Sequence, residues 1–294
     1  MSTPKESAPA SGSICLRQHT LAILQLDSAQ AKAQALLELD PKSHPLECDR
    51  EIIHTGELPG RPQRPVLVQP GALKHRAVGT AEGRASLIHA LTHIEANAIN
   101  LALDIVWRFG GLPEEFYRDW LTVAQEEALH YQLLASHLQG LGHQYGDFPA
   151  HDGLWDMAQR TRGDVLARLA LIPRTLEARG LDATPAIRKK LVSVGDLRGA
   201  QILDIILRDE IGHVATGNHW YRQICQQRRL DPLATSSRLA RQYAAPALKG
   251  PFNWVARKAA GFADEELAAL GAAPAPRSLN TLLDTREAHD TAAE

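Results

Sequence analysis

The sequence lacks a hydrophobic run that could cross a bilayer, since none approaches the roughly 18 apolar residues that a transmembrane helix needs. This absence excludes an integral membrane protein. Cysteine is also scarce: Cys15, Cys48 and Cys225 are widely spaced, and no Cys-x-x-Cys pair occurs. Such cysteine usage argues against a disulfide scaffold and a cysteine-ligated zinc site. It indicates a reducing compartment, so we expect a cytoplasmic protein with structural cysteines.

The chain also lacks an excess of charge of either sign. Lys and Arg number 32 against 34 Asp and Glu, a formal net charge of −2 over 294 residues. No long-range field therefore attracts nucleic acid or an anionic membrane. Residues 1–13 are rich in Ser, Pro and Ala, which predicts disorder, and they lack the apolar segment of a signal peptide.

Proline and glycine divide the chain into three parts. Residues 14–40 carry Leu and Ala at helical spacing and predict one or two short helices, whereas the repeated Pro and Gly of residues 41–71 predict an extended segment. We therefore assign 1–79 to an N-terminal extension, 80–230 to a central domain and 231–294 to a C-terminal helical extension with a frayed end. Short helices are expected there at 236–243, 253–260 and 264–270.

The central part carries four segments with apolar residues at the period of an α-helix. The helices predicted there span residues 81–109, 113–141, 153–179 and 184–229. Gly180 is expected to end the third helix, in which Pro173 predicts a kink, and Thr184 is expected to cap the fourth, which has a break near Gly195. The predicted fold class is all-α, a four-helix bundle with additional N- and C-terminal helices.

Two of the predicted helices carry a Glu-x-x-His motif. Glu127 and His130 lie in the second helix, and Glu210 and His213 lie in the fourth. A separation of three residues places a carboxylate and an imidazole on one helix face, within reach of one metal ion. A single motif of this kind also arises by chance on a solvated helix face, so it is weak evidence alone.

The first and third helices each supply a further acid, Glu95 and Glu177. Glu95 precedes Glu127 by 32 residues and Glu177 precedes Glu210 by 33, so the chain consists of two similar helix pairs. Charged residues in an apolar helix face are destabilising unless they are paired or bound to metal. Two bound divalent cations would account for all four of these glutamates together. The predicted metal ligands are Glu95, Glu127, His130, Glu177, Glu210 and His213; the alternative is two coincidental solvated faces.

A second acid precedes each motif, Glu126 before Glu127 and Asp209 before Glu210. Metal-bound imidazoles usually donate their other N–H to a carboxylate, a carbonyl or water, so Glu126 and Asp209 are candidates for that role. The alternative is that both are ordinary exposed charges. The remaining histidines of this region are expected to be packed or surface residues: His89, His93, His137, His143, His151 and His219.

These motifs resemble those of the ferritin-like di-iron carboxylate superfamily. The runs that carry a closer resemblance, to a bacterial ferritin-like family catalogued as a domain of unknown function, are HIEANAINLALD, EEALHYQLL, GDFPAHDGLWD, LEARGLD and ILRDEIGHVATG. PFNWVARKAAGF extends the resemblance towards the C-terminus. The metal motifs are also similar to those of the oxygen-dependent hydroxylase that modifies isopentenyl-adenosine in tRNA. The resemblance implies a ferritin-like bundle that holds two metal ions with the six ligands above.

Four carboxylates and two neutral imidazoles balance the charge of two divalent ions, and a ligand set without thiolate favours two Fe ions, or Mn, over zinc or copper. The favoured function is a non-haem di-iron protein that hydroxylates an unknown small-molecule substrate with O2 and an unknown electron donor. The alternatives are a ferroxidase or iron-handling protein and a metal-stabilised interaction protein without turnover.

A tRNA substrate is not favoured by the net charge and would need a local basic surface. The candidate residues for that surface are Arg188, Lys189, Lys190, Arg228, Arg229, Arg238, Arg241, Lys249, Arg257 and Lys258.

Overall fold

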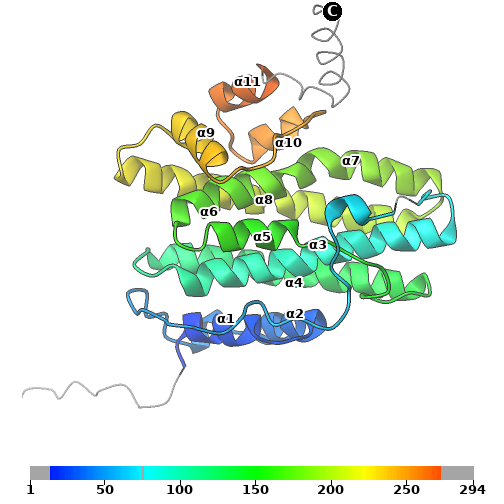
Figure 1. Ribbon diagram of the computed structural model, residues 1–294, viewed down its shortest axis with the longest axis horizontal. Helices are drawn as coiled ribbons and strands as arrows, with labels where there is room; N and C mark the ends of the chain where they lie inside the picture. Colours follow the sequence, from blue (N-terminus) through cyan, green and yellow to red (C-terminus); the bar gives the residue numbers. More distant parts are fainter. Residues whose placement is uncertain (1–13, 75, 273–294) are drawn as a thin grey trace, which may run out of the picture.

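A computed structural model describes residues 14–74 and 76–272, and these residues form an all-helical fold (Figure 1). The α-helices are α1 (Leu16–Leu24), α2 (Ala29–Glu38), α3 (Ala81–Arg108), α4 (Glu114–Gly140), α5 (Gly153–Arg160), α6 (Val165–Leu171), α7 (Ala178–Ser193), α8 (Leu197–Gln227), α9 (Pro232–Gln242), α10 (Trp254–Ala259) and α11 (Asp264–Ala272). Two short 3-10 turns (Pro41–Ser43 and Pro70–Ala72) and a π-helical segment, η3 (Ile172–Glu177), complete them. The predicted disorder of residues 1–13 and the predicted frayed end lie outside the described residues.

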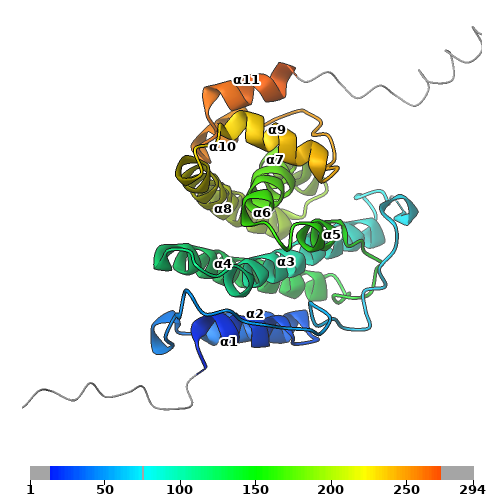
Figure 2. The ribbon, with the colours of Figure 1, turned by 60° about the vertical axis from the view of Figure 1, so that its left-hand side comes forward.

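The helices are stacked in layers (Figure 2). α3 and α4 pack side by side in the middle, with α1 against α3 and α2 against α4 on one side. On the other side α8 packs against α4, and α7 packs along α8. α9 and α10 cover this second pair from outside. The all-α prediction is confirmed, and the arrangement is compatible with a four-helix bundle.

The extended segment predicted between the N-terminal and central helices contains no helix over residues 44–69. It reaches the loop before α5, where Leu67 and Ala150 form an isolated parallel bridge. None of the described helices is long and apolar enough to cross a membrane. The three cysteines form no disulfide.

The first two central helices begin and end within one residue of their predicted bounds. Thr80 is the N-cap of α3, and its hydroxyl accepts a hydrogen bond from the Gly83 N–H at 3.0 Å. A side chain at position 83 would place its Cβ 2.0 Å from the carbonyl oxygen of Ala77, so only glycine fits this first turn. Pro113 is the N-cap of α4, one position before the first helical residue.

The predicted boundary between the third and fourth central helices is wrong. Gly180 and Thr184 both lie inside α7, and the break falls instead at residues 194–196, where Gly195 has φ 78° and Asp196 caps α8. The third central helix therefore runs in pieces from α5 through α6, η3 and α7. The break that was expected near Gly195 inside the fourth helix is the true boundary.

Distant residues explain why α7 continues through Pro185. Proline has no N–H to donate to the carbonyl of Leu181, four residues earlier, so a helix normally stops at such a position. In this structure the side chain of Asn253 donates a hydrogen bond to that carbonyl oxygen at 3.1 Å. A contact from the C-terminal extension thus replaces the missing backbone bond, and local sequence signals could not show it.

A buried ion-pair cluster joins α3 to α6. Both carboxylate oxygens of Asp104 accept from Arg108, and Asp104 also accepts from Arg168 at 2.6 Å. The Asp104 and Arg168 side chains are each 1% exposed. Burial alone would raise the pKa of Asp104, but the two guanidinium groups hold it below its usual value. Removing the charge of any one of these three residues would leave the others without full compensation.

We predict that Asp104→Asn destabilises the protein by about 3–5 kcal/mol, because it leaves the buried Arg168 without a counter-ion. The pKa of Asp104 is lower in the folded than in the unfolded state, so its contribution is present above about pH 4 and is lost as the pH falls below that. Urea denaturation at neutral and acidic pH measures both effects. Glu114→Gln, which removes an exposed pair with Arg118, is the control and should change little.

Candidate metal centre

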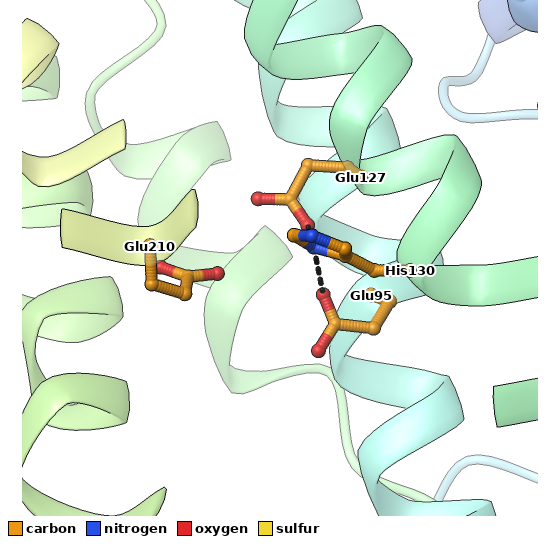
Figure 3. Close-up of side chains that lie close together, drawn as sticks. All are labelled: Glu95, Glu127, His130 and Glu210. Carbon is orange, nitrogen blue, oxygen red and sulfur yellow. Dashed lines mark hydrogen bonds and ion pairs between the residues drawn. The ribbon is translucent and has the colours of Figure 1, made fainter. Parts of the chain in front are cut away.

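Four side chains from three helices meet in the interior between α3, α4 and α8 (Figure 3). They are Glu95 from α3, Glu127 and His130 from α4, and Glu210 from α8. Each offers one ligand atom, and these atoms all lie within 4.8 Å of one another. The four residues are 0 to 9% exposed. Among the described residues, this group is close enough and buried enough to hold a metal ion.

His213 adds a fifth predicted ligand beside this group. Its Nδ1 lies 2.9 Å from Glu127 Oε1 and 3.8 Å from Glu210 Oε1. On the other side, His130 Nδ1 lies 3.4 Å from Glu127 Oε2 and 3.7 Å from Glu95 Oε2. Glu127 therefore presents one oxygen to each imidazole, and it is the shared member of two groups of ligands.

Two atoms of this site are buried without a hydrogen bond, Glu95 Oε2 and His213 Nδ1. The Nδ1 of His213 is close to Glu127, but the two atoms lack the direction of a hydrogen bond. Buried polar atoms nearly always have a partner, so these two exceptions require one. A divalent cation among carboxylate oxygens and imidazole nitrogens would satisfy both, and this donor set suits iron or manganese.

Glu177, the sixth predicted ligand, is the last residue of the π-helical segment. The hydroxyl of Thr175 donates to the Ala170 carbonyl at 2.8 Å in this segment, where Pro173 interrupts the α-helical ladder. Burial and the carboxylates of Glu210 and Glu127 raise the pKa of Glu177, but Glu177 is not among the four residues whose ligand atoms lie within 4.8 Å of one another. π-Helical turns often occur at functional sites. The sequence predicted a kink at Pro173, and the structure has a π turn that ends at this ligand candidate.

The buried carboxylates and imidazoles shift one another's protonation. Burial and the Glu127 carboxylate raise the pKa of Glu95 and of Glu210. Burial alone would lower the pKa of His130, but Glu127 and Glu95 raise it to about 11. Burial would raise the pKa of Glu127, but His213 and His130 hold it well below its usual range. The interior therefore has an excess of negative charge and attracts protons or cations.

The acids that precede the two motifs pair crosswise with the histidines. His130 Nε2 lies 3.1 Å from Asp209 Oδ2, and His213 Nε2 lies 2.7 Å from Glu126 Oε2. A hydrogen on each Nε2 leaves the lone pair of each Nδ1 directed at the cluster. The sequence made both acids candidates for this role, but the crosswise pairing depends on how α4 and α8 face each other.

Sequence reasoning gave no role to Arg208, which donates to both oxygens of Asp209 at 2.7 and 3.0 Å. Its only signal in the sequence is that it adjoins Asp209. The other histidines lie outside the cluster: His137 pairs with Asp196 at 3.0 Å, and His93 contacts the Tyr145 hydroxyl at 2.9 Å.

One of the basic residues proposed for an RNA surface is not on the surface. Arg257 is fully buried and bonds Asp182 at 2.6 Å and the carbonyl oxygen of Ala178 at 3.3 Å. It is buried because α10 packs against α7. Two others, Arg188 and Lys258, are exposed but form ion pairs with acids of this chain. This reduces the basic surface that the sequence offered.

The sequence matches a family described as "Protein of unknown function (DUF455)" over residues 22–268. The match extends beyond the central helices into both extensions. An uncharacterized protein of Haemophilus influenzae is 48% identical over 229 residues, which cover 76% of this chain and 80% of the relative. No solved structure matches the chain. Neither description states an activity, so a function has to be argued from the site.

We predict that Glu127→Gln reduces metal content more than Glu95→Gln does. Glu127 approaches both imidazoles, whereas Glu95 approaches only that of His130. Metal analysis after anaerobic reconstitution with Fe²⁺ and desalting measures the difference. Glu115→Gln, an exposed acid on the same helix, is the control. An empty wild-type protein, or equal losses in both variants, would contradict the prediction.

Asp209→Asn is predicted to weaken metal binding about 10- to 100-fold, because His130 loses the carboxylate that fixes its ring. Competition with a chelator measures the affinity. Arg208→Gln is the matched control, since it removes the solvent-side partner of the same carboxylate and keeps the contact with His130. Wild-type affinity in Asp209→Asn would mean that Asp209 is only a surface charge.

Proposed function

We propose that this chain, which belongs to the DUF455 family of proteins of unknown function, is a non-haem di-iron oxidoreductase with a ferritin-like four-helix bundle. One observation carries the proposal. The buried carboxylate of Glu127 lies between the Nδ1 atoms of His130 and His213, and acids hold the other nitrogen of each ring. This is the arrangement expected for imidazoles that each bind one of two metal ions.

The six proposed ligands divide into two halves. Glu95, Glu127 and His130 come from α3 and α4, and Glu177, Glu210 and His213 come from η3 and α8; all six would hold the two ions. The four carboxylates together with two neutral imidazoles carry the charge that two divalent cations neutralise. Oxygen and nitrogen donors without thiolate support iron, with manganese as the second choice.

Two ferrous ions bound there would supply two of the four electrons that reduce O2 to water; the organic substrate would supply the other two as it is oxidised, and the electron donor would restore the ferrous ions. The chain itself excludes water, since Ile99, Ile206 and Val214 near the ligands are at most 4% exposed. Glu126 links the site to solvent, because its side chain is 42% exposed and its carboxylate lies 2.7 Å from the Nε2 of His213. Glu126 can hold a proton at Nε2 of His213 while Nδ1 of the same ring is directed at the cluster.

The proposed substrate is a small organic molecule. The closed interior and the net charge of −2 give no attraction for a polyanion, and Arg257 is unavailable for a phosphate contact. A tRNA substrate would need the exposed basic residues alone to provide binding.

Oxygen consumption by the ferrous protein tests this function. With an excess of reductant, we expect continued O2 uptake beyond one equivalent per metal pair, and Glu127→Gln should abolish it. A single oxidation with retained iron would favour the ferroxidase or iron-handling alternative. No reaction in a protein shown to hold iron would favour a metal-stabilised interaction protein and contradict the proposal.

A further inference from the structure

A small cavity lies on the side of α3 that faces away from the metal centre. It has a volume of about 40 Å³ and is lined by α2, α3, the segment between α2 and α3, and Tyr145 from the segment between α4 and α5. Its polar walls come from Lys32, Arg61, His93, Asn97, Asn100 and Tyr145. This volume exceeds that of a single water site and accommodates a small acid group.

The buried lysine in this cavity has no acidic partner. Lys32 is 3% exposed, and its Nζ donates to the carbonyl oxygen of Gly60 at 2.8 Å and to Asn100 Oδ1 at 2.7 Å, both neutral acceptors. Among the described residues, no carboxylate forms an ion pair with it. A buried ammonium without a counter-ion is unfavourable, because lysine is rarely buried unless it is paired. The cavity therefore has an uncompensated positive charge.

Arg61 is a second cation in the wall of this cavity. Among the residues that the structure describes it pairs with Asp152, at 2.6 Å, and this pair leaves the lysine uncompensated. Burial and Arg61 lower the pKa of Lys32 to about 7, and Asp27, the acid that opposes this shift, is exposed. An anion in the cavity would reverse this effect by compensating Lys32.

A hydrogen-bond acceptor in the same cavity also lacks a partner. Asn97 Oδ1 is buried and accepts no hydrogen bond, although its amide nitrogen donates to the carbonyl oxygen of His93 at 3.1 Å. A ligand that satisfies this atom needs an N–H or O–H group. Together, the lysine and the asparagine call for an anion with a hydrogen-bond donor beside it.

The cavity adjoins a larger groove that can receive the rest of a ligand. The two share Ala29, Pro62 and Tyr145, and the groove has a volume of about 510 Å³. Its walls include the amide side chains of Gln30, Gln132, Gln139 and Gln144. A ligand can therefore place its acid group in the cavity and extend along this polar groove.

We propose that this cavity binds the carboxylate of a small organic acid, with Lys32 and Arg61 against the carboxylate and Asn97 accepting from a neighbouring hydroxyl or amide. The site is separate from the metal centre, because its walls lie on the opposite side of α3 from Glu95. The proposal does not depend on the proposed function, and its test needs no metal.

Ligand-observed NMR titrations of the full chain at constant ionic strength test the site with three probes, glycolate, acetate and acetamide. We expect glycolate to bind most tightly, acetate more weakly and acetamide not at all. Lys32→Met should weaken glycolate binding about tenfold or more, because a charge-assisted hydrogen bond is lost. Asn97→Leu should remove the advantage of glycolate over acetate. Lys42→Met, which replaces an exposed lysine, is the control and should bind like the wild type.

If Lys32→Met does not fold, Arg61→Gln provides the test, since Arg61 is partly exposed on a loop and its loss should also weaken glycolate binding several-fold. Absence of saturable binding in the wild type would overturn the proposal. Equal binding of glycolate by wild type and Lys32→Met would do the same. Binding of inorganic phosphate in preference to both carboxylates would overturn the assignment of the ligand class.

Discussion

The burial of three carboxylates close together in one interior is the constraint on which the rest of this structure depends. Like charges at this distance repel, and burial removes the water that would screen them. Two imidazoles lie among the carboxylates, and further acids hold those imidazoles from outside. The packing of α4 against α8 is therefore fixed by two crosswise polar contacts as well as by apolar side chains. A site of this kind requires added positive charge, which protons or metal ions can provide.

Much of this site could be predicted from the sequence because each Glu-x-x-His motif lies within a single helix. The Glu-x-x-His spacing follows from helix geometry alone. The structure brings four of the six predicted ligands within 4.8 Å of one another and places His213 beside Glu127 and Glu210. The crosswise pairing of Glu126 and Asp209 could not be predicted, since it depends on the register between two helices. The Lys32 cavity could not be predicted either, because Gly60 and Asn100 are distant in the sequence.

The error at Gly180 and Thr184 has the same origin. Glycine and proline in the sequence predict where a helix ends when no distant residue contacts the backbone. Here Asn253 is such a distant residue, because its side chain donates to the carbonyl oxygen of Leu181. The C-terminal extension contacts this region repeatedly: Glu266 pairs with the buried Arg174 of the π-helical segment. The extension is thus part of what holds Glu177 in place, which agrees with a family match that includes it.

The π-helical segment makes the two halves of the site mechanically unequal. Glu95 lies on α3, a continuous helix of 28 residues. Glu177 lies at the end of η3, where the hydrogen-bond ladder is already interrupted and can change register by local rearrangement. We therefore expect the position of Glu95 to be fixed more rigidly than that of Glu177. In the proposed enzyme, any adjustment of the ligands to a substrate would therefore fall on Glu177 more than on Glu95.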